Sequence, residues 1–296
     1  MNTRRGSIAL LSLRRPHQPQ DLPRFLDAAK KMNVQLEVYH PSDLHIRVRK
    51  GLSSLLNRDM KPVRFDAVIN WIPYPTTSEL NLVCDQLGIP FFNSTAAIRV
   101  AQNKMLSSLM WGASGLPHPD TFLAAQSHKA VGIPPLAFPL VLKPKTGTHG
   151  HHSLKLESWP ELGVPMNRRV LAQDIYLQEF VANCGWDLRV MVVGGRALGA
   201  IKKTVRPGGW RTHIAQGRRA EPFPLLDDLA SLACDAAKVL GLVVSGMDII
   251  ADLDGRYLLL EANGVPGLRI FETTTQISAA GAIIEHALGL ARGDLF

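Results

Sequence analysis

The chain has 296 residues, 46% of them hydrophobic, so it can fill a substantial core, which argues against a disordered protein. Its 33 Lys and Arg residues outnumber its 25 Asp and Glu residues, and this favours an anionic partner such as a nucleotide, a polycarboxylate or a nucleic acid. The basic residues are scattered, without a long basic tract or a known nucleic-acid motif, so a nucleic-acid partner has only the net charge in its favour.

The cysteines argue for a reducing compartment. Cys84, Cys184 and Cys234 are odd in number and far apart, and no Cys-x-x-Cys pair occurs. This pattern argues against a disulfide framework and against zinc. The apolar run at 8–11 ends at two arginines, far short of a membrane span. We therefore expect a cytoplasmic protein that does not enter a membrane.

Strands and helices alternate in the first third of the chain. The pattern predicts strands at 7–13, 34–39, 65–71 and 89–92, and helices at 21–32 and 77–87. This alternation predicts a small open α/β domain over residues 1–95.

The pattern changes after residues 95–115, which are predicted to be helical with a break near Asn103, followed by a turn at Pro117 and Pro119. From Phe138 the chain is rich in strands. These are predicted at 139–143, 153–156, 177–181, 188–193, 196–203, 244–251 and 257–261, with a helix at 227–240. The second part therefore has an α+β layout, and the whole chain combines α/β and α+β classes.

Three oxygen-bearing side chains lie near the end of the chain. Asp248 belongs to one apolar run, Glu261 and Asn263 end another, and the turn at 252–255 joins the two as a hairpin. Glu261 and Asn263 are two positions apart, so they point to one face, where Asp248 can approach them. Such hard oxygens suit magnesium bound together with phosphates. The alternative is that the acids are solvated at a sheet rim, but acids in apolar surroundings are costly unless paired or metal-bound.

A predicted strand ends on Lys143 and enters a loop that contains Gly147 and Gly150. A lysine in this position can place its ammonium beside a phosphate while loop amides close over the others. The segment does not fit the P-loop pattern, and a solvated hairpin turn is the alternative. The loop histidines invite a metal interpretation but lack a partner motif. They are His149, His151 and His152.

The next two strands offer a place for a base and a phosphoryl group. Main-chain groups near Glu179 can face an adenine edge, and Asp187 and Arg189 alternate on one face of the following strand. Arg189 could clamp a phosphoryl group or a carboxylate with two hydrogen bonds. The alternative is a structural ion pair. The basic run at 202–218 fits anionic substrates, or else is an ordinary basic surface loop.

Taken in chain order, these motifs resemble the ATP-grasp superfamily over residues 95–290, and within it the RimK-type glutamate ligases. That group includes LysX and the enzymes that add glutamate to tetrahydromethanopterin or deazaflavin coenzymes. The motifs that carry the resemblance are Lys104, Lys143 with its glycine loop, Gln178–Val181, Asp187-x-Arg189, Lys202-Lys203, Trp210-Arg-Thr, 241–248, Glu261-Ala-Asn263 and 267–275.

The resemblance implies three lobes: a pre-grasp α/β domain over 1–95, linker helices and a central lid domain over 96–182, and a C-terminal domain with the metal site over 183–296. It also implies chemistry in which a carboxylate takes the γ-phosphoryl group of ATP and an amine then displaces phosphate from the acyl phosphate. Positioning and electrostatics lower such barriers, so no catalytic triad is needed.

The resemblance assigns roles to individual residues. ATP phosphates are expected at Lys104 and Lys143 and adenine at 178–181. The full expected ATP-binding set is Lys104, Lys143, Gly147, Gly150, Gln178, Glu179, Phe180, Val181 and Asp187. Arg189 and Lys203 are the expected catalytic cations. Asp248, Glu261 and Asn263 are expected to hold two magnesium ions, with manganese as the alternative metal.

The sequence departs from the family pattern around the substrate. Lys203 stands where arginine is common, and the Arg-(Ser/Thr)-Asn run and its following basic-Gly-Gly are replaced by residues that include His213. The expected substrate contacts are Arg211, His213, Arg218 and Arg269. The leading hypothesis is a ligase that adds glutamate or a similar amino acid to an anionic coenzyme, carrier protein or peptide, working as a dimer or tetramer. A non-catalytic ATP-binding regulatory module is the alternative.

Overall fold

The computed structural model describes residues 7–13, 20–124, 136–146, 153–158, 160–161, 175–183, 185–204 and 220–294. The chain begins with a parallel sheet of order β2-β1-β6-β7, as the α/β prediction required. Its strands are β1 (Ser7–Leu11), β2 (Gln35–Tyr39), β6 (Ala67–Asn70) and β7 (Phe91–Phe92), with helices α1 (Leu22–Lys31) and α2 (Ser78–Gln86). The apolar strands β1 and β6 are almost wholly buried, as is usual where both faces of a parallel sheet are covered.

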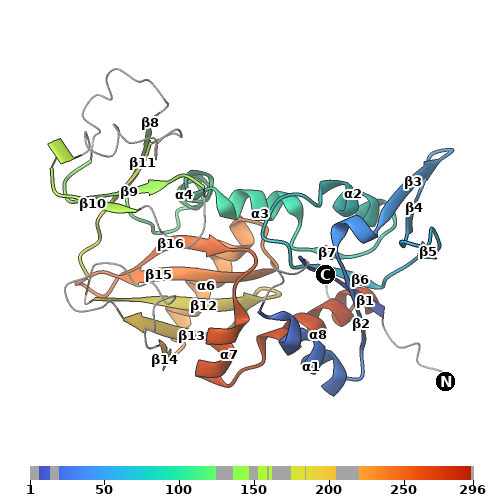
Figure 1. Cartoon of the computed structure of the whole chain (residues 1–296). Coiled ribbons are helices and arrows are strands. Elements are labelled where there is room, and N and C mark those ends of the chain that lie inside the picture. The colour runs from blue at the N-terminus through green and yellow to red at the C-terminus, as the bar shows by residue number, and fades with distance from the viewer. Residues whose placement is uncertain are drawn as a thin grey trace.

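A small antiparallel sheet interrupts this domain and was not predicted. After the short 3-10 helix η1 (Pro41–Asp43), it consists of β3 (His45–Arg49), β4 (Leu52–Leu56) and β5 (Pro62–Val63). Figure 1 shows β3 and β4 projecting away from the rest of the molecule. Most of β3 is exposed and it is rich in charge, so it lacks the apolar run by which the other strands were found.

Two helices lead to the second half of the chain, and they break where predicted. Helix α3 (Thr95–Gln102) ends at Asn103, and α4 (Lys104–Ala113) starts there. The Asn103 side chain accepts hydrogen bonds from the N–H groups of Met105 and Leu106, which is the usual role of an N-cap. Asn103 therefore fixes the position of Lys104 at the first turn of α4.

The central sheet is antiparallel, with the order β10-β9-β11-β8. It contains β8 (Thr121–Ala124), β9 (Leu140–Pro144), β10 (Leu154–Leu156) and β11 (Ile175–Glu179), of which only β8 was not predicted. Leu140, Leu142, Leu156 and Leu177 form an apolar cluster. The alternate positions, Lys143 and Gln178 among them, therefore belong to the opposite face of this sheet.

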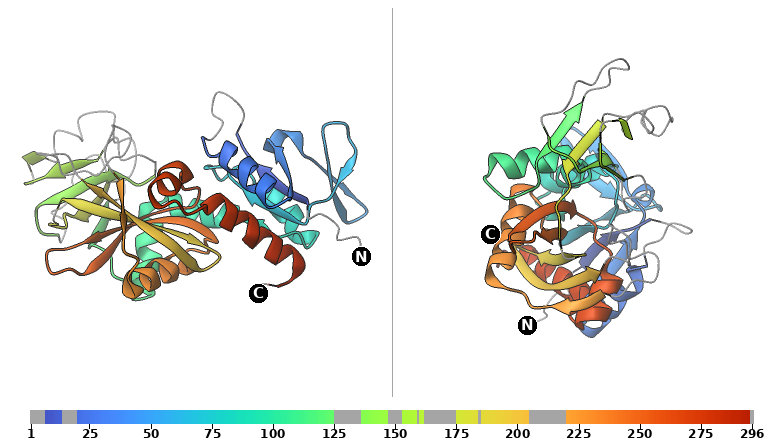
Figure 2. Two further views of the ribbon diagram at one scale, coloured as in Figure 1. Left: turned by 90° about the horizontal axis from the view of Figure 1, so that it is seen from below. Right: turned by 90° about the vertical axis from the view of Figure 1, so that its left-hand side faces the viewer.

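The last sheet is antiparallel, with the order β14-β13-β12-β15-β16. The strands are β12 (Trp186–Val193), β13 (Arg196–Thr204), β14 (Ala220–Phe223), β15 (Val244–Ala251) and β16 (Tyr257–Asn263), and the helices are α6 (Asp227–Val239), α7 (Leu268–Thr275) and α8 (Ala279–Arg292). Strand β14 and helices α7 and α8 were not predicted. One sheet face, with Leu188, Val190 and Met247, packs in a cluster with α6 residues. In the left view of Figure 2, α8 lies between the last sheet and the first domain.

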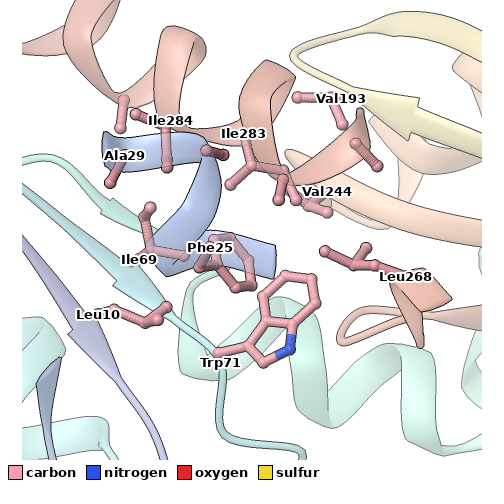
Figure 3. Close-up of a cluster of buried hydrophobic side chains, with 14 of the residues drawn as sticks. Leu10, Phe25, Ala29, Ile69, Trp71, Val193, Val244, Leu268, Ile283 and Ile284 are labelled. Atoms are coloured by element: carbon pink, nitrogen blue, oxygen red, sulfur yellow. The ribbon is translucent and has the colours of Figure 1, made fainter. Parts of the chain in front are cut away.

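The opposite face of this sheet shares a core with the first domain. Met191, Val193 and Val244 belong to one cluster with Leu10 and Ile69 of the parallel sheet and with residues of α7 and α8 (Figure 3). Phe25 and Trp71 meet edge to face inside this cluster, with ring centroids 4.9 Å apart. Because α8 packs on α1 and β6, the ends of the chain are joined by apolar packing. The domain boundaries at 95 and 182 stay a prediction.

Every helix within the described ranges is too short or too polar to cross a lipid bilayer.

Candidate active site

The register of the last sheet gathers the expected site residues on one face. In adjacent strands Asp187 lies opposite Lys203, Arg189 opposite Asp248, and Asp248 opposite Glu261. Residues that face each other across paired strands direct their side chains to the same side of a sheet. These are the charged positions of the face whose apolar positions pack against α7 and α8.

Asp248 is the centre of this charged cluster. Arg189 donates two hydrogen bonds to its carboxylate, from Nε to Oδ1 at 2.9 Å and from Nη2 to Oδ2 at 2.7 Å. Lys203 Nζ lies 3.0 Å from Asp248 Oδ1 and 2.7 Å from Asp187 Oδ1, so this lysine bridges two acids. Asn263 Nδ2 lies 3.3 Å from Asp248 Oδ2. The expected metal residue Asp248 and the expected catalytic cations are therefore in direct contact.

Burial sets the electrostatics of the cluster, because Asp187, Lys203 and Asp248 are each less than a tenth exposed. Burial by itself would raise the pKa of Asp248, but Arg189 and Lys203 hold this pKa well below its usual range. Burial raises the pKa of Asp187 far above its usual value although Lys203 opposes the shift. Burial would lower the pKa of Lys203, and the two acids raise it instead. Asp248 is therefore ionised and Lys203 is cationic at neutral pH.

Two further lysines approach from other elements. Lys104, at the start of α4, lies 3.2 Å through its Nζ from Glu261 Oε1 and is 9% exposed. Lys143 on β9 donates from Nζ to Gln178 Oε1 at 2.6 Å. Burial lowers the pKa of Lys143 to about 8, Glu261 raises it and Lys104 lowers it. The central sheet, α4 and β16 therefore bring the expected site residues Lys143, Lys104 and Glu261 to one place.

A small cavity of about 40 Å³ adjoins this place on the side of the first domain. Its polar lining includes Gln102, Lys104, Glu261 and Asn263. Pro73 also lines the cavity. Gln102 donates through Nε2 to the Pro73 carbonyl oxygen. Sequence reasoning missed Pro73 and Gln102. Pro73 follows the carboxyl end of β6, and ligands of open α/β sheets gather at this end, so that rule could have pointed to it.

The expected adenine segment lies at the end of β11. The N–H of Glu179 donates to the Asp120 carbonyl at 2.9 Å, and the N–H of Phe180 donates to the Pro139 carbonyl at 3.0 Å. The Phe180 ring lies 4.1 Å from the ammonium of Lys155, measured to the ring centroid. The segment is thus held against neighbouring strands on one side.

Some expected residues are not gathered here. Arg269 is exposed at the start of α7, where its N–H donates to Asp21 Oδ1, and no contact recorded among the described residues joins its guanidinium to the cluster. The remainder lie outside the described residues. They are Gly147, Gly150, Arg211, His213 and Arg218, together with the loop histidines His149, His151 and His152.

A solved structure has the same architecture over nearly the whole chain. The ATP-grasp ligase PsnB, solved with precursor peptide PsnA2 and AMPPNP, matches with a TM-score of 0.74 and 20% identity, covering 98% of this chain and 99% of that one. This likeness shows an ATP-grasp fold, and the predicted fold class is confirmed.

Sequence relatives identify the family of this chain within the ATP-grasp fold. Residues 101–287 match the model of the RimK-like ATP-grasp domain. The chain is 32% identical to "Probable alpha-L-glutamate ligase 2" of Hahella chejuensis (strain KCTC 2396), over 89% of this chain and 90% of that protein. It is 30% identical to "Probable alpha-L-glutamate ligase" of Thioalkalivibrio sulfidiphilus (strain HL-EbGR7), over 94% of this chain and 93% of that protein. The chain belongs to the RimK-like ATP-grasp family and is an ATP-grasp ligase, so the predicted family and enzyme class are confirmed.

Proposed function

We propose that this ligase uses ATP to join the amine of glutamate, or of a similar amino acid, to an acceptor carboxylate through an acyl phosphate. The observation that carries the proposal is the convergence of Arg189 and Lys203 on Asp248, beside Lys104 on Glu261. Cations and carboxylates at this density suit a triphosphate, its metal and a transferring phosphoryl group. The names of the two relatives support glutamate as the amino acid.

The donor set fits magnesium. Asp248 and Glu261 face each other, and Asn263 adds an amide next to Asp248, so hard oxygen atoms from two strands are available. Among the described residues no three His, Cys, Asp or Glu side chains cluster as a self-sufficient metal site. Two acids and an amide leave coordination positions for ATP phosphates, and magnesium commonly shares its site with substrate phosphates. A structure of PsnB with Mg and ADP supports the same cofactors, and we keep two magnesium ions as part of the proposal.

Bound magnesium would neutralise charge on the phosphates. The chain's own residues would do the rest: Lys104 and Lys143 hold the phosphates, and Arg189 and Lys203 hold the phosphoryl group and the acceptor carboxylate. An acceptor carboxylate oxygen attacks the γ-phosphorus and ADP leaves. The amine then attacks the acyl carbon and loses a proton as phosphate leaves. Such catalysis depends on positioning and charge.

We place adenine against 178–181. The N–H groups of Glu179 and Phe180 are already bonded within the protein, so the N–H of Val181 is the donor that we assign to the base. We retain Asp187 as an ATP-site residue, and its ion pair with Lys203 supports a role in holding that cation.

The acceptor is a coenzyme of the pterin type, a carrier protein or a peptide in this proposal. The PsnB complex with its precursor peptide supports a peptide as the acceptor. The small cavity lined by Gln102, Glu261 and Asn263 is where we place the reacting end of the substrate. Arg211, His213, Arg218 and Arg269 remain proposed substrate contacts, and a dimer or tetramer remains a prediction.

The direct test combines purified protein, ATP and magnesium with glutamate and other amino acids, in the presence of acidic peptides or folate-like coenzymes. We expect phosphate release that requires both an amino acid and an acceptor, and a product heavier than the acceptor by one amino acid less water. Glu261→Gln is the matched inactive control. Binding of ATP without phosphate release in any combination would favour a regulatory module instead.

A further inference from the structure

We propose that Tyr176 is a positioning residue for Lys143, and that Ser108 of α4 anchors it. A chain of side-chain hydrogen bonds runs from α4 through Tyr176 and Gln178 to the Lys143 ammonium. The inference rests on the proposed function in one respect, which is that Lys143 contacts an ATP phosphate.

The hydrogen bonds from Lys143 through Gln178 to Tyr176 run in one direction. Lys143 Nζ donates to Gln178 Oε1 at 2.6 Å, and Gln178 Nε2 donates to the Tyr176 hydroxyl at 3.2 Å. The Tyr176 hydroxyl lies 3.2 Å from Ser108 Oγ. An ammonium can only donate, so the amide must present its oxygen to Lys143 and its NH₂ to Tyr176. The Tyr176 oxygen then accepts from Gln178, and the hydroxyl also pairs with that of Ser108, where either group can be the donor.

Tyr176 therefore holds the Gln178 amide in the orientation that the Lys143 ammonium requires. Without the hydroxyl, the NH₂ group would lose its acceptor, and a flipped amide would set a donor against the ammonium. Water cannot easily replace the hydroxyl, because Tyr176 is 0%, Gln178 2% and Ser108 3% exposed. Burial also raises the pKa of Tyr176 well above its usual range, so the phenol is protonated at neutral pH.

Helix α4 also positions Lys104, the second lysine that we expect at the ATP phosphates. Lys104 begins α4 and pairs with Glu261, and its N–H donates to the Lys145 carbonyl at 3.0 Å. Asn103 forms a bridge with Thr146, just beyond β9. Helix α4 thus holds one lysine through its own backbone and the other through Ser108 and Tyr176. Both lysines are therefore connected to the same helix.

The test measures binding of AMPPNP with magnesium, and of adenosine, by calorimetry. Tyr176→Phe keeps the ring and removes the hydroxyl. It should weaken AMPPNP binding about 5- to 10-fold, the scale of one hydrogen bond between neutral groups, and leave adenosine binding unchanged. Ser108→Ala should also weaken AMPPNP binding. Tyr39→Phe is the control, since its hydroxyl bonds Glu37 outside the site, and it should change neither affinity.

The decisive step is a double-mutant cycle with Lys143→Met. In that background Tyr176→Phe should have no further effect on AMPPNP, because the group that it positions is gone. An additive effect, or an equal loss for adenosine, would show that Tyr176 only packs and would overturn the inference. If Lys143→Met itself left AMPPNP binding intact, the ATP placement in the proposed function would fail. If it weakened binding and Tyr176→Phe did not, only the positioning role would fail.

Discussion

Asp248 lies directly opposite Glu261 in the antiparallel pair of β15 and β16, immediately before the register shifts between Asp248 and Ile249. Each acid is engaged by a cation from another element: Asp248 by Arg189 and Lys203, and Glu261 by Lys104. The irregularity therefore lies next to two acids that are paired with cations from β12, β13 and α4.

Replacing Asp248 with asparagine should greatly slow turnover, although the new side chain has nearly the same size and shape. Asp248→Asn keeps the shape but removes the charge that binds Arg189, Lys203 and the proposed magnesium. We expect ATP-dependent phosphate release to fall on the order of 100-fold or more, with a higher magnesium concentration needed for half activity. A magnesium titration of phosphate release measures both. Wild-type turnover in this variant would contradict the metal assignment.

The neighbouring residues Lys202 and Lys203 should differ strongly in their effect on stability. Lys203 is 4% exposed between two buried acids, so Lys203→Met leaves uncompensated charge and should lower the free energy of unfolding by about 3–5 kcal/mol. Lys202 points the other way, and its partner Glu221 has a side chain that is 56% exposed, so Lys202→Met should cost under about 1 kcal/mol. Urea unfolding monitored by circular dichroism compares the two, and equal losses would show that the buried cluster does not depend on Lys203.

The pH dependence of ATP use should report Lys143. Burial lowers the pKa of this lysine to about 8, and its proposed role of holding an ATP phosphate requires the cationic form. The value of kcat/KM for ATP, which reflects the free enzyme, should therefore fall as pH rises through about 8. Lys143→Arg keeps the charge at higher pH, so its alkaline decline should move upward. An unchanged decline in that variant would assign the titration to another group.

Asn93 should contribute to stability through the joint between the first domain and the last sheet. Its Oδ1 accepts from the N–H groups of Val243 and Val244, and its Nδ2 donates to the carbonyls of Val244 and Gly264. Asn93→Ala would leave these buried groups unpaired at about 1–3 kcal/mol each, so we expect a loss of about 3 kcal/mol after relaxation. Thermal unfolding measures it, with the exposed Gln86→Ala as control. A melting temperature equal to that of the control would show that the Asn93 hydrogen bonds do not stabilise the contact between the first domain and the last sheet.

Most regular elements could be predicted from sequence because their signals are local. The hairpin of Asp248 and Glu261 follows from two apolar runs and one turn, and the shared face of Asp187 and Arg189 follows from the two-residue period of a strand. Strands β3, β8 and β14 were missed because short or exposed strands depend on hydrogen-bonded neighbours more than on an apolar run.

The sequence by itself determined which residue types are available for the proposed ATP and metal chemistry, and on which strands and helices they lie. Tertiary structure alone decided their partners. Lys104 meets Glu261 only because α4 packs between two sheets, and Ser108 meets Tyr176 across 68 residues of chain. Such contacts depend on how whole elements pack, and no local periodicity records them. Lys143 and Asp248 were therefore predicted as separate signals, and the fold made them parts of one charged site.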